Sequence, residues 1–245
     1  MYLSLVIPTY NEENKIAHDI TEALSFLSKQ DFQSEVLIVN DGSLDGTYQV
    51  IEETIQKIPV SDKVSFKILS YTTNRGKGYA VKYGVTNATG EMVAFVDSGF
   101  CVPFHYLLKG FEKIRLGADL AIASRRHEAS KIQRYQPFYR QLGSKIFRHL
   151  VQLFMGIRVS DTQCGFKIYR QSAAKKIFTR LQTDGFMFDI EALFIAKRLN
   201  LNISEFGVEW SNDSDTRFHP LWGTFRNIKE LIKIRIRTYN LDVSP

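Results

Sequence analysis

The chain has few cysteines and no long apolar run, and each shortage excludes a class of protein. Its two cysteines, Cys101 and Cys164, form neither a metal-ligand pattern nor a disulfide framework, which favours a reducing, cytoplasmic setting. No stretch of the 245 residues reaches the roughly 18 uninterrupted apolar residues that a membrane-spanning helix needs. The opening segment, MYLSLVIPTYNEE, lacks a basic region and a small-residue cleavage site, so we interpret it as a first strand and not as a secretion signal.

Acidic residues are scarce in two basic segments of this chain, whose formal net charge is +6. Residues 125–148 set one acid, Glu128, against Arg125, Arg126, Lys131, Arg134, Arg140, Lys145 and Arg148. Residues 226–242 set Glu230 and Asp242 against Arg226, Lys229, Lys233, Arg235 and Arg237. Such segments attract phosphates, anionic lipid or nucleic acid, although a solvated basic face produces the same pattern. Because no nucleic-acid recognition motif accompanies them, we expect no nucleic-acid partner.

The first half of the sequence alternates between short apolar runs and amphipathic segments. Strands are predicted over 3–8, 35–40, 64–71 and 91–96, with helically spaced apolar residues between them. This alternation favours an α/β fold with a mainly parallel sheet and helices on both faces. Ligands of such sheets bind at the carboxyl ends of the strands, where we expect Pro8, Asp41 and Asp97.

The second half is less regular and contains two helices with apolar faces. Strands are predicted over 118–124 and 203–210, and helices over 140–156, 184–199 and 224–239. The apolar faces consist of Leu142, Ile146, Leu150 and Phe154, flanked by Phe147 and Val151, in one helix and of Phe225, Ile228, Ile232, Ile236 and Tyr239 in the other. Such faces pack onto a core or lie in a membrane interface. We expect a catalytic domain, 1–220, and a C-terminal basic amphipathic helical extension, 221–245, in the same structural unit.

Polar residues at the predicted strand ends suit the recognition of a nucleotide. Asp41 can accept a hydrogen bond from a ring N–H and Tyr10 offers a flat surface, although Asp41-Gly42-Ser43 is also typical of a plain turn and helix start. The glycine-spaced loop 74–78, NRGKG, can bring backbone N–H groups and Lys77 near a phosphate, but it lacks the spacing of a P-loop.

Several blocks of the sequence together resemble the family 2 glycosyltransferases of GT-A (Rossmann-like) fold. They are VIPTYNEE, VNDGSLDGT, NRGKGYAVKYG, the strand ending at Asp97, ASRR, SDTQCGFKIYR and FDIEALFIAKR, in order along nearly the whole chain. They resemble in particular the dolichyl-phosphate or polyprenyl-phosphate β-glucosyltransferases, and DTQCGFK, 161–167, is the most specific block. The resemblance implies an inverting transfer of a hexose, glucose from UDP-glucose, to a polyprenyl or dolichyl phosphate. Another sugar such as mannose from GDP-mannose, a non-lipid acceptor, and a nucleotide-sugar-binding relative without activity stay open.

The resemblance also assigns candidate site residues. Nucleotide-sugar binding falls on Pro8, Tyr10, Glu12, Asp41, Lys77 and Asp97, and catalysis on Asp97, Arg125, Arg140 and Arg217. Arg125 and Arg140 match basic positions around the donor and acceptor phosphates, and Arg217 matches a basic residue that closes over the site. Arginine suits these roles because its planar fork binds phosphate and stays charged. Asp189 and Glu191, on a predicted helix, are either structural or orient the site.

The expected metal site departs from the family pattern. Where the family carries Asp-x-Asp, this chain has Asp97-Ser98-Gly99, so one carboxylate is missing. Mg²⁺ or Mn²⁺ bound by Asp97 and the substrate diphosphate is one solution, since Mg²⁺ often uses one or two protein carboxylates. Catalysis without a metal, in which Lys77 and the arginines compensate the diphosphate, and binding without catalysis are the alternatives.

The implied acceptor places the reaction at a membrane surface. We expect the protein to associate peripherally with the cytoplasmic face of a membrane, through the helix near 142–155 or the C-terminal helix. Salt should weaken this association, because the basic residues of both helices attract anionic lipid.

Overall fold

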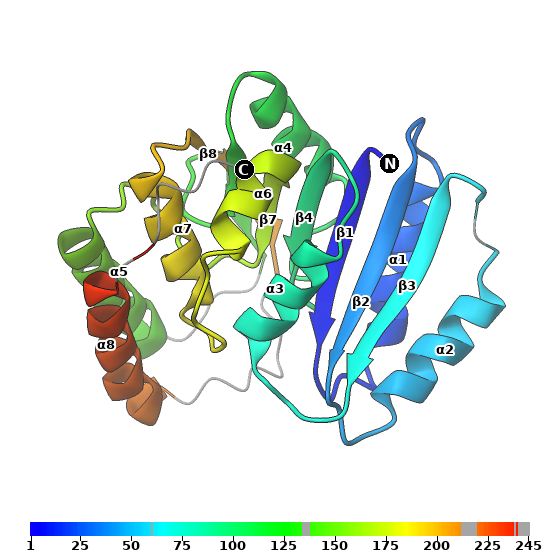
Figure 1. The fold of residues 1–245 in the computed structure, drawn as a ribbon, viewed down its shortest axis with the longest axis horizontal. Coiled ribbons are helices and arrows are strands. Elements are labelled where there is room, and N and C mark those ends of the chain that lie inside the picture. The colour runs from blue at the N-terminus through cyan, green and yellow to red at the C-terminus, as the bar shows by residue number, and fades with distance from the viewer. Residues whose placement is uncertain (60, 134–137, 212–219, 238, 240–245) are drawn as a thin grey trace.

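A seven-stranded sheet, in the order β3-β2-β1-β4-β7-β5-β8, forms the centre of the protein (Figure 1). The computed structural model describes all residues except 60, 134–137, 212–219, 238 and 240–245, with the backbone alone described at 138–144, 146 and 220–226. The strands are β1 (Leu3–Thr9), β2 (Ser34–Asp41), β3 (Val64–Tyr71), β4 (Met92–Val96), β5 (Leu120–Ser124), β6 (Lys131–Ile132), β7 (Phe166–Arg170), β8 (Ile203–Gly207) and β9 (Glu209–Trp210). The helices are α1 (Ile16–Leu27), α2 (Thr47–Lys57), α3 (Lys77–Thr86), α4 (Tyr106–Arg115), α5 (Phe138–Met155), α6 (Gln171–Phe178), α7 (Phe188–Arg198) and α8 (Pro220–Ile236).

The sheet is mainly parallel, as the alternation of strands and helices predicts. β1 pairs in parallel with β2 and β4, β2 with β3, and β5 with β8. Every residue of β1 and β2 is buried, which is typical of strands that are covered on both faces. The carboxyl ends of β1, β2, β4 and β5 therefore meet at one edge, where the candidate residues follow them.

Strand β7 is one of four elements that the sequence analysis did not predict, together with β6, α4 and α6. It runs antiparallel between β4 and β5, and it carries a lysine, Lys167, at its second position. Phe166 and Ile168 enter the core on one face of the sheet, whereas Tyr169 enters the core on the other. A buried lysine in a short central strand obscures the apolar pattern on which the prediction of strands depends.

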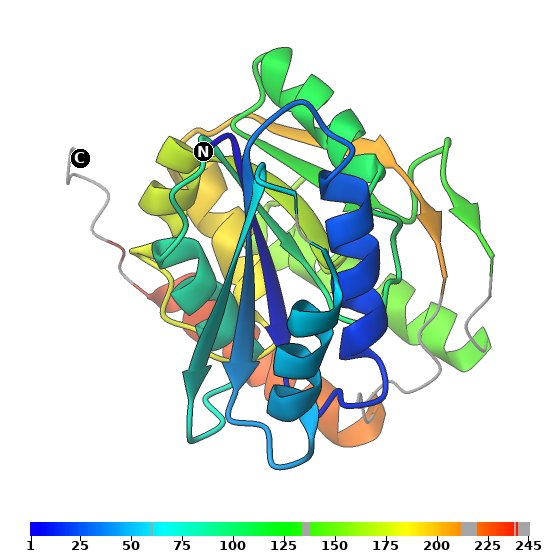
Figure 2. The same cartoon turned by 90° about the vertical axis from the view of Figure 1, so that its right-hand side faces the viewer.

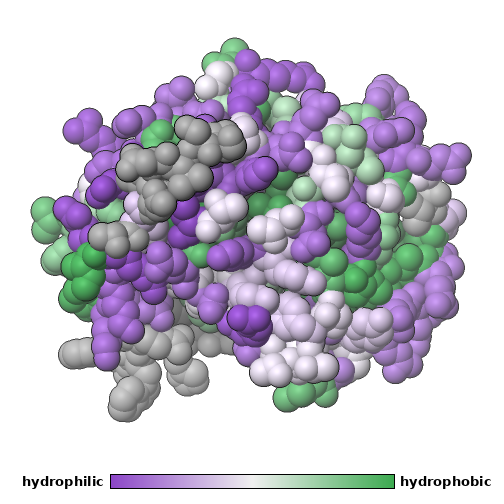
Figure 3. Space-filling view, viewed as in Figure 1, coloured by the Kyte–Doolittle hydropathy of each residue, from purple (hydrophilic) through white to green (hydrophobic). Residues whose placement is uncertain are grey.

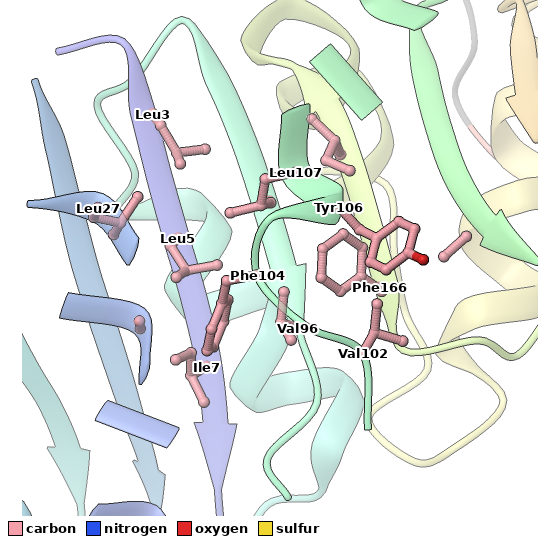
Figure 4. Packing of buried hydrophobic residues seen from close by; sticks show 14 of the residues in the cluster. Leu3, Leu5, Ile7, Leu27, Val96, Val102, Phe104, Tyr106, Leu107 and Phe166 are labelled. Carbon is pink, nitrogen blue, oxygen red and sulfur yellow. The ribbon is translucent and has the colours of Figure 1, made fainter. Parts of the chain in front are cut away.

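Helices cover both faces of the sheet, which confirms the predicted architecture. The apolar sides of α1, α2 and α4 pack on one face, and α3, α5, α6, α7 and α8 contribute to the core on the other. Figure 2 shows α1 and α2 on one side of the strands and α3 on the opposite side. Figure 4 shows part of the first core, in which Leu5 and Ile7 of β1 lie near Phe104.

Helices α5 and α8 contact each other at the end of the sheet away from β3 (Figure 1). On α8, Leu231 and Ile234 are buried, whereas Ile228, Ile232 and Ile236 of the predicted apolar stripe are exposed. This stripe therefore faces away from the core, because the side of α8 that carries Leu231 supplies the packing. The division of the chain at residue 220 stays a prediction.

Helix α5 has the same two-sided character. Val151 and Met155 are buried in the core, whereas Leu153 and Phe154 are exposed. Figure 3 shows apolar side chains among polar ones at the left edge of the molecule, over α5 and α8. Within the described residues, no helix combines the length and the apolar character that a bilayer crossing requires.

Candidate functional site

An ion pair between Asp97 and Lys77 lies where β4 ends and α3 begins. The Lys77 Nζ is 2.7 Å from the Asp97 Oδ1, and both side chains are partly exposed. Burial lowers the pKa of Lys77, but the charges of Asp97 and Asp189 outweigh burial and hold this pKa above its usual value. Lys77 is therefore a permanent cation at the edge where ligands of parallel sheets bind.

The backbone of Gly165 supports the Asp97 carboxylate. The Asp97 N–H donates to the Gly165 carbonyl at 2.8 Å, which ties β4 to the segment before β7. A Cβ at position 165 would lie 2.0 Å from Asp97 Cγ, so the carboxylate occupies the space that any larger residue needs. This close approach explains the glycine in the DTQCGFK block.

A second, buried ion pair lies behind the first. The Nζ of Lys167, which is fully buried in β7, is 2.5 Å from Asp189 Oδ1 and donates to the Cys164 carbonyl at 2.8 Å. Burial raises the pKa of Asp189 above its usual range, and the positive charges of Lys167 and Lys77 oppose that effect only in part. Asp189 therefore holds Lys167 directly and raises the pKa of Lys77 through its charge, which favours the site-orienting interpretation of this residue.

Arg125, directly after β5, is bound by Asp161 in a bidentate ion pair. Its Nε and Nη2 lie 2.6 and 2.8 Å from the two carboxylate oxygens, and its backbone N–H also donates to Asp161. Burial raises the pKa of Asp161, but the charge and hydrogen bonds of Arg125 have a larger opposite effect, so this pKa lies below its usual range. The carboxylate of Glu205 accepts hydrogen bonds from Ser160 and from the Asp161 N–H, which fixes the segment that holds this pair.

Asp97 and Arg125 belong to one electrostatic cluster. The negative charges of Asp161 and then of Asp97 raise the pKa of Arg125, against the opposing effect of burial. The pKa of Cys164 responds to the same groups, and burial raises it to about 12. Both residues are also tied to the segment 161–165, since the Asp97 N–H donates to the Gly165 carbonyl and Arg125 pairs with Asp161.

Asp41 organises the loop that precedes Lys77. Its two carboxylate oxygens accept the backbone N–H groups of Arg75 and Gly76 at 2.7 and 2.9 Å, and the Asn74 side chain donates to it at 2.9 Å. Gly76 has a φ of 101°, and a Cβ there would lie 2.5 Å from the Asp184 carbonyl. The NRGKG loop is therefore held between Asp41 and the segment before α7. The N–H groups of Arg75 and Gly76 in this loop are hydrogen-bonded to Asp41.

The remaining nucleotide-side candidates follow β1. Pro8 is buried opposite Val39, whereas Tyr10 and Glu12 are partly exposed in the loop that follows. The Glu12 N–H donates to Thr47 Oγ1 at 2.7 Å, and its carboxylate is 3.6 Å from Lys15 Nζ. These contacts hold the loop after β1 against the start of α2, near the end of β2.

Two predicted catalytic residues cannot be placed as side chains. Arg217 lies outside the described residues, and for Arg140 the structure describes the backbone alone, in the first turn of α5.

The position of the missing second acid is a tight turn. Gly99 has a φ of 94°, which disfavours any larger residue, and its N–H donates to the buried Asp19 at 2.8 Å. Throughout the described part of the chain, no group of three or more His, Cys, Asp or Glu residues could hold a metal ion. Among the described residues, Asp97 is therefore the carboxylate at this turn that could bind a divalent ion, and a substrate could supply further oxygen ligands.

Sequence reasoning missed the partners that fix the site. Asp161 and Lys167 lie inside the DTQCGFK block, which carried the resemblance, but neither received a role of its own. The available signal was a pair of opposite charges, Asp161 and Lys167, at the two ends of a short block, since buried charges in proteins are usually paired.

The family model for glycosyl transferase family 2 matches residues 4–178. Curated relatives include the dolichyl-phosphate beta-glucosyltransferase of Homo sapiens. It is 33% identical to this chain over 246 residues, and the match covers 96% of this chain and 75% of that protein. The enzyme of that name from Saccharomyces cerevisiae is 33% identical over 252 residues, with the same coverage of 96% and 75%.

Solved structures share the fold. Glucosyl-3-phosphoglycerate synthase from Mycobacterium tuberculosis in complex with UDP superposes with a TM-score of 0.68 at 18% identity, covering 96% of this chain and 79% of that one. The same enzyme with Mn²⁺, UDP-glucose and phosphoglyceric acid gives a TM-score of 0.68 at 16% identity, with coverage of 95% and 78%. The extent of the family match and the identity to the curated relatives lead to one conclusion: the chain belongs to glycosyl transferase family 2.

Proposed function

We propose that the protein transfers glucose from UDP-glucose to the phosphate of a polyprenol, such as dolichyl phosphate, with inversion at the anomeric carbon. The observation that carries this proposal is the identity of 33% to a relative named dolichyl-phosphate beta-glucosyltransferase, across 96% of the chain. A structural neighbour crystallised with UDP-glucose supports the choice of donor.

The reaction joins two anions, so position and compensating charge are the expected sources of acceleration. The phosphate monoester of the acceptor is ionised near neutral pH, and its oxygen can attack C1 of glucose without a strong general base. A bond forms from this oxygen to C1 while the bond from C1 to the diphosphate oxygen breaks, and UDP leaves with the electron pair. Lys77 and Arg125 supply positive charge on the two sides of this exchange, and their raised pKa values keep both protonated.

The acids of the site act on these cations. Asp97 and Asp189 hold the charge of Lys77 at the end of β4, and Asp161 fixes the plane of the Arg125 guanidinium. Asp41 maintains the loop from which Lys77 projects. We assign Pro8, Tyr10 and Glu12, at the end of β1, to the nucleotide side.

Asp97 and the diphosphate of the donor are the groups that would hold Mg²⁺ or Mn²⁺. Such an ion would neutralise charge on the departing UDP. Structural neighbours crystallised with Mn²⁺ and UDP support this assignment. Because Asp97 is the one protein carboxylate that we assign to this ion among the described residues, we expect metal affinity to be weak until the donor is bound.

A panel of labelled donors tests the proposed reaction. The protein is incubated with a short polyprenyl phosphate and with UDP-glucose or GDP-mannose, each with Mg²⁺ or with EDTA. We expect label in the lipid fraction from UDP-glucose and more of it with Mg²⁺. Lipid label from GDP-mannose alone would refute the choice of sugar, and binding of UDP-glucose without lipid label would identify a non-catalytic relative.

The exposed sides of α5 and α8 support peripheral binding at the cytoplasmic face of a membrane. Leu153 is 80% exposed and Ile236 is 73% exposed, and the exposed Lys229, Lys233 and Arg235 accompany them. Apolar side chains flanked by basic ones are typical of helices that lie in a membrane interface, and the cytoplasmic leaflet carries the anionic lipid that attracts them.

Flotation with vesicles of phosphatidylcholine and phosphatidylserine tests this placement. We expect the protein to float with these vesicles at low salt. Ile232→Glu should weaken vesicle binding about ten-fold, because a charge replaces apolar surface that enters the membrane interface. Leu44→Glu, at an exposed apolar residue after β2, is the matched control and should float normally. Equal flotation of both variants would contradict the role of α8.

A further inference from the structure

Trp210, the last residue of β9, lies against the guanidinium of Arg125. The Arg125 Cζ is 5.3 Å from the centroid of the indole ring, within the roughly 6 Å range of a cation–π interaction, and tryptophan is the strongest partner for one. Trp210 is 8% exposed, whereas the Arg125 side chain is 28% exposed. The indole is therefore withdrawn from solvent, and the cation that it contacts stays accessible.

Asp161 and Trp210 restrain Arg125 in different ways. The Asp161 carboxylate binds one edge of the guanidinium through its Nε and Nη2 atoms, whereas an indole attracts the positive charge as a whole. Within the described residues, the remaining Nη1 group of Arg125 makes no hydrogen bond. This group is therefore available to a substrate phosphate while the other two are occupied.

The segment that carries Trp210 is tied to the strand that precedes Arg125. The Ser130 hydroxyl donates to the Ser124 carbonyl at 2.5 Å and accepts the Val208 N–H at 3.1 Å. β6 then pairs in parallel with β9. The indole and the arginine are thus held by one hydrogen-bonded frame, so their separation does not depend on the two side chains alone.

The other end of the same segment is tied to the loop after β4. The Ser211 N–H donates to the Cys101 carbonyl at 3.0 Å, and Cys101 belongs to the loop that begins at Asp97. The segment of Trp210 is therefore attached to both strand ends that carry the site. A change at Trp210 can shift Arg125 relative to Asp97 without altering either residue.

We infer that Trp210 is a positioning residue of the transfer reaction, whose indole holds the Arg125 guanidinium so that Nη1 is directed at a substrate phosphate. The inference rests on the proposed function for the identity of that phosphate. Trp210 acts through Arg125 and needs no contact with a substrate. Because Trp210 also packs in the core on its side of the sheet, the inference requires that its aromatic face matter beyond its bulk.

Two substitutions of Trp210 separate its aromatic face from its bulk. Trp210→Phe keeps an aromatic ring, and Trp210→Leu leaves an apolar side chain without one. Trp210→Leu should lower kcat about ten-fold, because a cation–π interaction is lost and the guanidinium moves, whereas Trp210→Phe should stay within about three-fold of the wild type. The Kd for UDP-glucose, measured by calorimetry, should change by less than about two-fold in both variants.

Tyr106→Leu is the control for lost packing. Tyr106 is buried in the same core cluster, and its ring centroid lies 4.8 Å from the Nζ of Lys109, so this variant loses a cation–π contact that does not involve Arg125. It should lower Tm and keep the wild-type kcat. If both Trp210 variants keep the wild-type kcat, or if both lose it equally, Trp210 only packs and the inference is overturned.

Fluorescence tests the same inference without glucose transfer. The chain has two tryptophans, so Trp222→Phe leaves the emission of Trp210 alone. A phosphate that binds Arg125 changes the charge beside the indole, and we expect a short polyprenyl phosphate or UDP-glucose to change this emission. Such a change supports the inference even if no glucose is transferred, in which case the proposed function fails alone. Emission that stays constant with either substrate and with both together would overturn the inference.

Discussion

Replacing Gly165 by alanine should displace the Asp97 carboxylate without unfolding the protein. The added Cβ would lie 2.0 Å from both Cγ and Oδ2 of Asp97. To reach an ordinary separation of roughly 3.5 Å, the carboxylate must move by about 1.5 Å. The backbones cannot separate easily, because the Asp97 N–H is bonded to the Gly165 carbonyl at 2.8 Å. The movement therefore falls on the side chain, and its ion pair with Lys77 is broken.

The magnitude follows from this displacement. A misplacement of about 1 Å in a reacting site can cost ~100-fold in rate, which equals ~2.7 kcal/mol of transition-state free energy. Overpacking costs about 1–3 kcal/mol of unfolding free energy, which lowers Tm by several degrees in a chain of this length. We therefore expect Gly165→Ala to fold at 25 °C and to lose about 100-fold in kcat/KM for UDP-glucose.

The assay is glucose transfer to a short polyprenyl phosphate, with Tm measured on the same samples. Gly185→Ala is the matched control, because the nearest atom to its Cβ would be Glu230 Oε1 at 3.8 Å, an ordinary contact. This control should retain the wild-type rate. If Gly165→Ala folds and its rate stays within about three-fold of the wild type, the position of Asp97 does not matter to the reaction.

Two further predictions concern stability. Burial raises the pKa of Glu35, but hydrogen bonds from hydroxyl and amide donors have a larger opposite effect and hold this pKa below 4.5. The charge of Glu35 therefore stabilises the fold above that pH, and this contribution is lost as the pH falls through the pKa of the folded protein. Glu35→Gln should lower the unfolding free energy in urea at pH 7 by about 1–3 kcal/mol and flatten its decline below pH 4.5, whereas the exposed Glu112→Gln should do neither; equal values at pH 7 would refute this. Arg237→Ala should cost about 2 kcal/mol in the same measurement, because its Nη1 lies 2.9 Å from the fully buried Glu191. The exposed Lys233→Ala is its control, and an unchanged unfolding free energy for Arg237→Ala would show that Glu191 does not need this cation.

The sequence predicted the parallel half of the fold and the convergence of its strand ends. Apolar runs alternating with helical spacing determine which strands are parallel, and parallel strands bring Asp41 and Asp97 to one edge. The sequence did not predict β7, because a buried lysine interrupts its apolar pattern. It also could not orient α8, since an apolar stripe such as Ile228, Ile232 and Ile236 has the same spacing whether it packs or faces outwards.

The pairing of charges was harder to predict than their position. Spacing along the chain placed Lys77 and Asp97 at neighbouring elements, but the Arg125–Asp161 pair joins segments that lie 36 residues apart, with β6 and α5 between them. Glu191 received either a structural or an orienting role from its sequence, and the structure gives it a structural one. Its carboxylate accepts Arg237 and the Tyr239 hydroxyl, which fastens the end of α8 to α7.

The most direct test of the account follows labelled glucose from UDP-glucose into a lipid-soluble product, in the wild type and in Asp97→Asn. The account predicts one UDP released for each glucose attached through a β-linkage to polyprenyl phosphate, and a loss of at least ~100-fold in the variant. A wild-type protein that binds UDP-glucose but labels no lipid phosphate, or an Asp97→Asn variant as fast as the wild type, would contradict it.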